Sequence, residues 1–307
     1  MNSLKRLLKC VITLVCILIL ISGCSKDIST FGKDTNISGR ISNSQFKVHY
    51  IDVGQGDSIL VQDGDKNMLI DTGTNESQNY LISYLKKQNI KEINYMVLTH
   101  PHEDHIGGAD KVIKNFIVDK IYMNSVSTNT KTFRDLIYAM KEKGLKADEP
   151  DSENFKLNKA DCNVYGPVNP TEGNLNTYSI VVKVTYGQNK FLFTGDTQSS
   201  NEEAMIEKGY DLKCDVLKIA HHGSRTSSTD DFLNYVSPKY AVISCGRDND
   251  YGHPHKSTVE KLKNRNIPLY RTDENGTIIC VSDGSTIKFS CSPGDYKMGS
   301  RKNRYSK

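Results

Sequence analysis

The sequence predicts a mixed α/β (α+β) domain in which two sheets pack face to face between outer helices, a four-layer αββα sandwich. Three observations support this prediction. The folded part begins with short apolar runs of strand length, separated by turn residues. These runs then alternate with segments whose apolar residues recur at helical spacing. The same plan occurs twice, at 46–143 and at 178–290, so each half is expected to supply one sheet with its helices.

The first half opens with strand signals and then alternates strands with helices. Its expected strands are 46–53, 58–62, 68–71 and 93–100. Asp63-Gly64-Asp65 supplies a hairpin turn. Helices are expected at 78–88, after Gly107-Gly108 and at 131–143. The last of these carries four apolar residues at helical spacing: Phe133, Leu136, Ile137 and Met140.

The second half repeats this order. Its expected strands are 178–186, 190–196, 215–222, 240–246 and 268–273, followed by a hairpin at 277–290. Its expected helices are 201–209, 229–235 and 258–264. Each half therefore runs from a strand hairpin into alternating strands and helices, and both sheets are expected to be mixed.

The N-terminus has the features of an export signal. A basic start precedes an apolar run at 11–21, which is too short to span a bilayer comfortably. The small residues before Cys24 resemble the lipobox of bacterial lipoproteins, in which the cysteine is acylated. We expect 1–23 to be a lipoprotein signal peptide, Cys24 to be lipidated, and the rest to lie on the outer face of the cell membrane. An uncleaved anchor and ordinary signal cleavage are the alternatives.

Composition divides the remainder into a tether, a domain and a tail. Residues 24–45 are rich in Ser, Asn, Asp and Gly, which predicts a flexible tether. The domain is expected at 46–292, and the polar, basic stretch 293–307 is expected to be a solvated tail, with contact to a membrane or a polyanion as the alternative. Without 1–23, which holds three basic residues and no acidic one, the formal net charge falls from +4 to +1. This near-neutral charge argues against a broadly basic nucleic-acid coat.

The cysteines do not form the pattern of a disulfide scaffold. Three of the eight lie in the first 24 residues, and the other five are scattered without C-x-x-C spacing. Cys214 and Cys245 lie in apolar, strand-like runs, so we expect them to be small core residues. The sequence shows no signature of an obligate protein partner.

Four expected strands end in polar residues. Asp71, His100 and Asp196 each follow an apolar run, and His221-His222 follows another. A single such aspartate is usually a turn or cap residue. Four of these strand ends together indicate a site, because strands hold side chains rigidly while the adjoining loops admit a ligand.

The segment THPHEDHIGG contains three of the eight histidines of the chain and two carboxylates. In an extended loop, alternate residues point the same way, so His100, His102 and Asp104 are expected to converge while His105 turns to the opposite side. Imidazole nitrogens and carboxylate oxygens bind divalent zinc, manganese or iron. Ligands this closely spaced predict two neighbouring metal ions. A solvated histidine-rich loop is the structural alternative.

The motif HPHEDH resembles the H-x-H-x-D-H signature of the metallo-β-lactamase fold. The motifs YIDVGQGDSILV, LIDTG, FLFTGD, DVLKIAHHGSRTSS, PKYAVISCG, YGHP and YRTDENGTI are similar to the extracellular metallo-hydrolase domain of the competence protein ComEC. The resemblance covers about 46–290 and implies an αββα metallo-β-lactamase sandwich. Because no polytopic channel segment accompanies it, we expect a free-standing, lipid-anchored relative of that domain.

The resemblance also implies a ligand set for two divalent ions, zinc or manganese. His100 and His102 would bind one ion, and Asp104 and His105 the other. Asp196 would bridge the two. One ion could be bound more tightly than the other.

Further roles follow from the same resemblance. His222 would complete the second ion, with His221 behind it; the reverse assignment stays open, because adjacent side chains point apart. Asp71 would orient a ligand histidine or the bridging water. Together with Asp104 and His253, Asp71 is expected to act in catalysis.

One feature departs from the pattern of the fold. Many members place another metal-binding histidine between the H-x-H-x-D-H motif and the bridging aspartate, whereas 106–195 contains no histidine. Asn174, Asn176 or Ser179 could face the metals instead. The first ion would then keep a position open for water, for substrate or for His253.

Two bound cations would lower the pKa of a bridging water from about 15.7 toward about 7, so the expected chemistry is hydrolysis. The groups around them favour phosphate. Ser224 and Arg225 follow the expected ligand, and His253 could protonate a leaving group or contact a phosphoryl oxygen, unless it is a simple turn residue. Further basic residues lie near strand ends: Lys218, Arg247, Lys256 and Arg271.

We therefore expect a membrane-tethered, metal-dependent phosphodiesterase or nuclease, with DNA as the substrate that the resemblance implies. The near-neutral charge argues against a long nonspecific DNA track, so a small phosphodiester, such as a choline-phosphate ester of the envelope, is the enzymatic alternative. Other hydrolytic chemistry of the fold also stays open. A non-catalytic surface protein that binds DNA or a partner is the alternative of another class, and the intact aspartates and histidines disfavour it.

Overall fold

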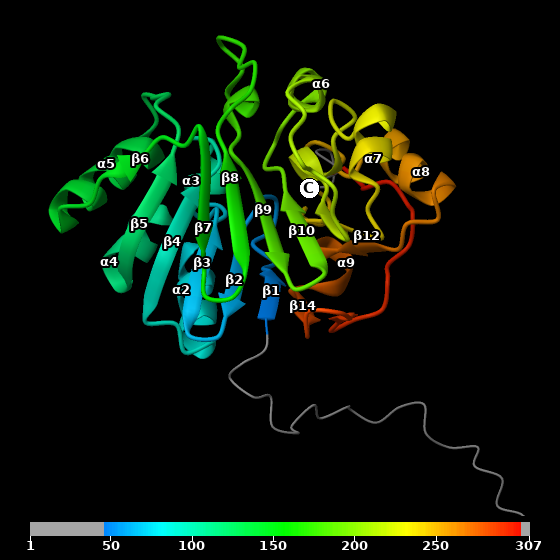
Figure 1. Cartoon of the computed structure of the whole chain (residues 1–307). Coiled ribbons are helices and arrows are strands. Elements are labelled where there is room, and N and C mark those ends of the chain that lie inside the picture. The colour runs from blue at the N-terminus through cyan, green and yellow to red at the C-terminus, as the bar shows by residue number, and fades with distance from the viewer. Residues whose placement is uncertain (1–45, 302–307) are drawn as a thin grey trace, which may run out of the picture. The chain divides into compact units, whose positions relative to one another are not determined.

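The computed structural model describes residues 46–301, so the expectations for the signal peptide, Cys24 and the tether lie outside the described residues. Within the described part, two sheets carry helices on their outer sides (Figure 1). No helix among these residues is long and apolar enough to cross a bilayer. The expected αββα arrangement is confirmed.

The first sheet has eight strands in the order β15-β14-β1-β2-β3-β4-β5-β6. Its strands are β1 (Phe46–Tyr50), β2 (Ile59–Asp63), β3 (Lys66–Ile70), β4 (Glu92–Leu98), β5 (Ile117–Met123), β6 (Ala147–Asp148), β14 (Ile278–Ser282) and β15 (Ile287–Phe289). Strands β3 to β6 are parallel neighbours, and the other pairs are antiparallel. The carboxyl ends of β3 and β4 therefore meet at one edge of the sheet.

The second sheet has seven strands in the order β13-β12-β11-β10-β9-β8-β7. They are β7 (Ser152–Lys156), β8 (Asp161–Tyr165), β9 (Val181–Tyr186), β10 (Asn189–Phe193), β11 (Val216–Lys218), β12 (Tyr240–Ile243) and β13 (Leu269–Arg271). Parallel neighbours run from β10 to β13, and the other pairs are antiparallel, so this sheet is mixed. This places the ends of β10 and β11 side by side.

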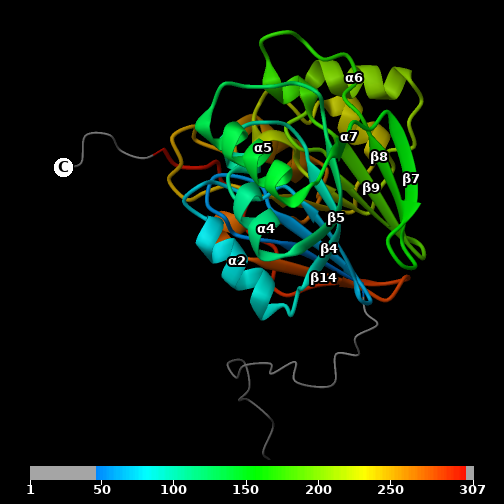
Figure 2. The ribbon, with the colours of Figure 1, turned by 90° about the vertical axis from the view of Figure 1, so that its left-hand side faces the viewer.

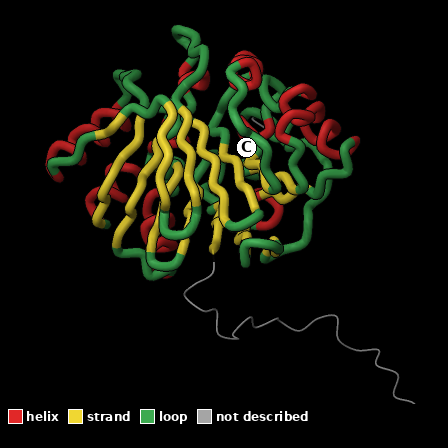
Figure 3. The backbone as a smooth tube through the Cα atoms, viewed as in Figure 1, coloured by secondary structure: helices red, strands yellow, loops and turns green. Residues whose placement is uncertain are grey.

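Helices cover the outer face of each sheet. The first half contributes α2 (Gln78–Lys87), α3 (Glu103–Ile106), α4 (Ala109–Asn115) and α5 (Lys131–Lys143). The second half contributes α6 (Ser199–Glu207), α7 (Asp230–Val236), α8 (Lys256–Asn264), α9 (Thr272–Asn275) and the short 3-10 turns η1 (Leu175–Tyr178) and η2 (Ala220–Gly223). Figure 2 shows α2, α4 and α5 in front of the first sheet, and Figure 3 shows the strands between the two groups of helices.

Three apolar clusters hold the layers together. The first contains side chains of both sheets, such as Val48 and Phe193, and fills the space between them. The second joins the first sheet to α2, α4 and α5, and the third joins the second sheet to α6, α7 and α8. Cys214 and Cys245 lie in the third cluster as free thiols, as expected.

Two features of the fold were not anticipated from the sequence. The hairpin β7–β8 forms the edge of the second sheet, although its exposed, polar first strand gives little strand signal. The hairpin expected to close the second half instead joins the first sheet, where β14 pairs with β1. Pairing across this sequence distance depends on tertiary packing, which local patterns do not record.

The stretch expected to be a solvated basic tail packs on the domain as far as it is described. Gly294 donates its backbone N–H to Leu269 O (2.7 Å), and Gly299 donates to Pro254 O (2.7 Å). The Tyr296 hydroxyl donates to Ile267 O (2.8 Å). Most side chains of 293–301 are exposed, which fits a solvated stretch, but the backbone of this segment is bound to the domain. Because this segment ends beside Pro254, it bounds the loop that carries His253.

The loop after β3 and the start of α4 approach each other closely at Gly107. The Gly107 N–H donates to Gly73 O (2.8 Å), and a methyl group at Gly107 would overlap the backbone of Thr74 and Asn75. Gly107 thus allows the H-x-H-x-D-H segment to lie directly against the Asp71 loop.

We expect Gly107→Ala to lower the free energy of unfolding by at least about 2 kcal/mol, because backbone atoms cannot move aside as a flexible side chain can. Urea denaturation measures the change. Gly144→Ala is the matched control: its added methyl meets no neighbour, and only its left-handed φ of 66° is unfavourable, at about 1 kcal/mol. Equal losses for the two variants would contradict the close-packing explanation.

Candidate metal centre

The polar strand ends of both halves meet at one place. His100 follows β4, Asp196 follows β10, and the two histidines of η2 follow β11. The sheets are tied together at this edge, because Ile180 donates its N–H to Thr99 O (3.0 Å). The expected convergence of residues far apart in the sequence is therefore present.

The H-x-H-x-D-H segment is only partly extended. His102 has extended backbone angles, but α3 begins at Glu103, so Asp104 and His105 project from a helical turn. The His105 ring consequently lies beside that of His100, with centroids 4.1 Å apart. The expectation that His105 turns away from His100 is wrong, because alternation along an extended chain ends where the helix starts.

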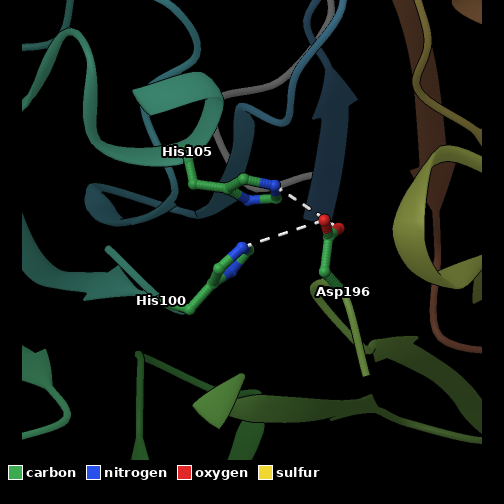
Figure 4. A group of neighbouring side chains, drawn as sticks. All are labelled: His100, His105 and Asp196. Carbon is green, nitrogen blue, oxygen red and sulfur yellow. Dashed lines mark ion pairs between the residues drawn. The ribbon is translucent and has the colours of Figure 1, made fainter. Parts of the chain in front are cut away.

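Asp196 lies at the centre of the cluster. Its carboxylate is 3.4 Å from His105 Nε2 and 3.8 Å from His100 Nε2, and both rings point toward it (Figure 4). His222 Nε2 approaches the same carboxylate at 3.6 Å and that of Asp104 at 3.2 Å. One aspartate thus faces imidazoles from both halves of the chain.

The donor atoms form groups that fit metal ions. His100, His105 and Asp196 make one such group, and Asp104, His105 and His222 make another. His105 Nε2, His222 Nε2 and Asp196 Oδ1 are buried and have no hydrogen-bond partner. Buried polar atoms without partners are costly, and a divalent cation would satisfy all three.

His102 takes a more exposed place than expected. Its Nδ1 lies 2.9 Å from His100 Nε2, and its ring lines the open cleft, but it belongs to none of the compact ligand groups among the described residues. His105 rather than His102 therefore shares a compact ligand group with His100, although His102 makes the hydrogen-bond contact with the His100 ring.

Both histidines of η2 approach the carboxylate of Asp196, because His222 Nε2 lies 3.6 Å and His221 Nε2 lies 3.7 Å from its Oδ2. His222 is buried and also lies 3.2 Å from Asp104, whereas His221 lines the cleft with its Nδ1 3.2 Å from Thr226 Oγ1. Both residues have left-handed backbone angles, with φ of 51° and 53°. The geometry supports His222 over His221 as the candidate ligand.

The electrostatics of the cluster are set by its carboxylates. Burial alone would lower the pKa of His105, but Asp196, Asp71 and Asp104 together raise it well above its ordinary value. Burial is likewise outweighed at His222, where Asp196 and Asp57 raise the pKa to about 10. These negative charges thus favour positive charge at the site, which a divalent cation would supply.

Asp71 holds two residues of the H-x-H-x-D-H region in place through its carboxylate. It accepts the Thr99 N–H (2.8 Å) at one carboxylate oxygen, and its other oxygen lies 2.7 Å from His105 Nδ1. Thr72 further fixes the segment by donating its N–H to His105 O (2.6 Å). The side chain of Asp71 therefore orients a candidate ligand histidine, one of its two expected roles.

Asp57 is a member of the site that sequence reasoning missed. It is buried, its Oδ2 lies 2.6 Å from Lys218 Nζ, and its Oδ1 lies 3.4 Å from His222 Nδ1. His222 Nδ1 is also 3.0 Å from Ser244 O. Lys218 was the signal in the sequence that could have indicated a buried carboxylate such as Asp57, because a lysine inside the buried run DVLKIA requires an anionic partner.

The same ion pair corrects the expected role of Lys218 as a phosphate contact, because its side chain is fully buried. Arg271 is also buried and pairs with Asp273 (2.6 Å) and Glu274 (3.0 Å). Arg247 donates to the Asp273 carbonyl (2.8 Å), and Lys256 lies near Glu260 (3.6 Å). None of these four cations lines the cleft.

The region that lacks the further histidine contributes two of the three expected polar residues to the site. Ser179 Oγ accepts the Asp196 N–H (3.0 Å) and lies 3.4 Å from His100 Nδ1. Asn176 lies on the cleft, with Nδ2 3.4 Å from His221 Nε2. Asn174 instead donates to the Gln198 side chain (3.1 Å) and does not line the cleft.

The candidate ligands open into a cleft of about 580 Å³. It is lined by Gln55, Thr74, Glu76, His102, Glu103, Asp104, Asn176, Asp196, His221, His222, Tyr251 and His253. Ser224 is not among them; its hydroxyl lies 3.1 Å from Thr226 Oγ1. Burial and the neighbouring histidines lower the pKa of His253 to about 3. A neutral His253 can donate an N–H to a substrate oxygen, but it carries no imidazolium proton to give to a leaving group.

Residues 51–247 match the family model described as the metallo-beta-lactamase superfamily. Among curated proteins, ComE operon protein 3 of Bacillus subtilis (strain 168) is 30% identical over 77% of this chain and 33% of its own length. Competence protein ComA of Neisseria gonorrhoeae is 32% identical over 74% of this chain and 31% of its own length. The chain thus spans about a third of these relatives.

Two solved structures share the fold. Tm1679, described as a metal-dependent hydrolase of the beta-lactamase superfamily, is 17% identical with a TM-score of 0.50, over 74% of this chain and 94% of that one. CmlA, a diiron beta-hydroxylase from Streptomyces venezuelae, is 12% identical with a TM-score of 0.51, over 74% of this chain and 53% of that one. At these identities the likeness shows the fold alone.

We expect Lys218→Met to lower the free energy of unfolding by about 3–5 kcal/mol, because it leaves the buried Asp57 carboxylate unpaired. The double variant Asp57→Asn/Lys218→Met should recover most of this loss. Lys156→Met is the control; its pair with Asp161 is exposed on both sides and should contribute less than about 1 kcal/mol in the same urea titration. A double variant as unstable as the single one would contradict the pairing.

Proposed function

Because the chain belongs to the metallo-beta-lactamase superfamily and is a hydrolase of that fold, we propose that it cleaves phosphodiester bonds with bound divalent ions, DNA being the favoured substrate. The observation that carries the proposal is the set of buried, partnerless donor atoms on His105, His222 and Asp196, which face one another across a small space. Competence proteins among the relatives support the choice of DNA.

Each candidate ligand would be held by the protein itself. Asp71 fixes His105 through Nδ1, and Asp57 with Ser244 O fixes His222 through Nδ1, so both Nε2 atoms face the ions. Bound zinc or manganese would supply a water that ionises near neutral pH. His253, neutral and beside the cleft, would donate its N–H to an oxygen of the substrate.

A small phosphodiester is the second candidate substrate, and the lining of the cleft favours it. Among the described residues no lysine or arginine lines the cleft, whereas Glu76 and Glu103 do. A substrate with few phosphates, such as a choline-phosphate ester, would meet less repulsion from these carboxylates than a polyanion would. A non-catalytic binding role is less consistent with a centre that retains its metal-ligating imidazoles and carboxylates.

The ligand assignment predicts metal loss from specific variants. Asp196→Ala and His222→Ala should weaken zinc or manganese binding by at least about 100-fold, because each removes a shared ligand. His221→Ala is the matched control and should retain the metal. Metal content by mass spectrometry and competition with a chelator measure both. Retention of metal by His222→Ala with loss in His221→Ala would reverse the assignment.

The reaction is tested with the metal-loaded full chain on a DNA strand, bis-p-nitrophenyl phosphate and nitrocefin. We expect hydrolysis of the two phosphodiesters, abolished by chelator and restored by manganese or zinc, and none of the lactam. Hydrolysis of nitrocefin alone would contradict the phosphodiester proposal. Metal binding without any turnover would favour the non-catalytic alternative.

We further propose that the enzyme is tethered outside the cell membrane through a lipid on Cys24. This proposal rests on the sequence pattern before Cys24. In a bacterial host, Cys24→Ser should move the protein from the detergent phase to the aqueous phase on Triton X-114 partitioning and abolish labelling by a fatty-acid analogue. Unchanged labelling of Cys24→Ser would contradict lipidation at this residue.

A further inference from the structure

The segment YGHPH, residues 251–255, presents three rings at alternate positions. The Tyr251 ring stacks on that of His253, with centroids 5.5 Å apart and planes 16° apart. The His255 ring packs edge-on against the His253 ring, with centroids 4.7 Å apart. The His253 ring is in turn 6.1 Å from that of the candidate ligand His222. A continuous set of rings therefore runs from the candidate metal centre to the rim of the cleft.

Tyr251 is an unusually exposed aromatic residue for a cleft. It lines the same cleft as Asp104 and Asp196, yet 58% of its surface is exposed. His253 covers one side of its ring and leaves much of the remainder open to solvent. An exposed aromatic face beside a reactive centre is suited to stacking against a planar group.

The loop that carries Tyr251 is held in place by Asn249. The Asn249 side chain accepts the N–H of Tyr251 (3.1 Å) and that of His253 (3.0 Å). Its amide also donates to Gly246 O (2.9 Å) and to His253 O (2.7 Å). The backbone that carries Tyr251 and His253 is thus fixed before any substrate binds, which lowers the entropy lost when a ligand stacks on the Tyr251 ring.

Two arginines lie next to this loop. Arg225 donates its backbone N–H to His255 Nδ1 (3.0 Å), and a methyl group at Gly252 would lie 3.0 Å from Arg301 Cγ and Nε. Both residues are exposed, and neither guanidinium forms an ion pair within residues 46–301. Both charges act on the half-buried His255. Burial lowers the pKa of His255, and the two arginines lower it further.

Carboxylates also lie near this loop. Burial raises the pKa of Tyr251, and the charges of Asp104, Asp250 and Glu103 raise it further, so these carboxylates lie within electrostatic reach of its hydroxyl. Asp250 has an interaction of its own. A strand bound at the cleft would therefore keep its phosphates toward the two arginines and away from these carboxylates.

Resting on the phosphodiesterase function above, we propose that Tyr251 is a stacking platform for an unpaired base and that Arg225 and Arg301 bind the adjoining phosphates, so the site selects single-stranded nucleic acid. A base has the planar face that Tyr251 can stack on, and a phosphate has the charge that the two arginines complement. A duplex keeps its bases stacked within itself and cannot use the platform without local opening.

The test measures binding of a fluorescent phosphorothioate dT strand, which resists hydrolysis, to the metal-loaded full chain by anisotropy. Tyr251→Ala and Tyr251→Leu should weaken binding by about tenfold, and Tyr251→Phe should retain it, because the ring face rather than the hydroxyl makes the contact. Tyr138→Ala is the matched control, an exposed tyrosine on α5 outside the cleft. A blunt duplex should bind more weakly and respond less to Tyr251→Ala.

The arginines are tested by salt dependence. Arg225→Ala and Arg301→Ala should each reduce the slope of log Kd against log salt concentration by about 0.7, the contribution of one phosphate contact on a single strand. Lys141→Ala on α5 should leave the slope unchanged. If both arginine variants showed the same salt-dependence slope as the unmodified protein, Arg225 and Arg301 would not bind phosphates of the strand.

The outcomes separate this inference from the proposed function. Bis-p-nitrophenyl phosphate has neither a nucleobase nor a second phosphate, so its hydrolysis tests the phosphodiesterase alone. If that ester is cleaved while Tyr251→Ala binds the strand as tightly as the unmodified protein, the platform is wrong and the enzyme stands. If the ester is not cleaved while the variants weaken binding as expected, the strand site stands and the hydrolase proposal fails.

Discussion

The burial of several carboxylates in one small volume is the constraint on which this structure depends. Asp57, Asp71, Asp104 and Asp196 all lie in or against the candidate centre, and an uncompensated carboxylate in such a place would be prohibitively costly. Lys218 compensates one of them directly. Asp71 accepts the Thr99 N–H and lies against His105 Nδ1. Asp104 and Asp196 face His222 Nε2 and His105 Nε2, which have no hydrogen-bond partner. Positive charge between these groups would complete the arrangement, and divalent ions would supply it.

The αββα architecture makes this arrangement possible. Each sheet delivers part of the ligand set from the ends of its parallel strands, and the apolar cluster between the sheets fixes the distance between the two parts. The hydrogen bond from Ile180 to Thr99 O joins them at the site itself. The rim is built differently, from loops, which carry binding residues on the rigid scaffold of the sheets. Substrate choice is therefore expected to reside in rim residues such as Tyr251.

Much of the site was predictable from residue types and positions. The dense His and Asp pattern of 100–105, the aspartates after two strands and the paired histidines after a third all carried a local signal. What local signals did not settle was which side chains face one another. The His105 ring lies beside that of His100 because a helical turn starts between the two residues. Asp57 was missed because nothing near it in the sequence shows its contact with Lys218.

The sequence alone determined the alternation of strands and helices, including the helix at 131–143, because periodicity is a local property of the chain. It also determined the ligand chemistry, since the imidazoles and carboxylates are set by composition. Only the tertiary structure decided the pairing of β14 with β1, the packing of 293–301 beside Pro254 and the assembly of a rim from distant loops. These features join residues far apart in sequence, and their free energy depends on contacts that exist only once both sheets have packed together.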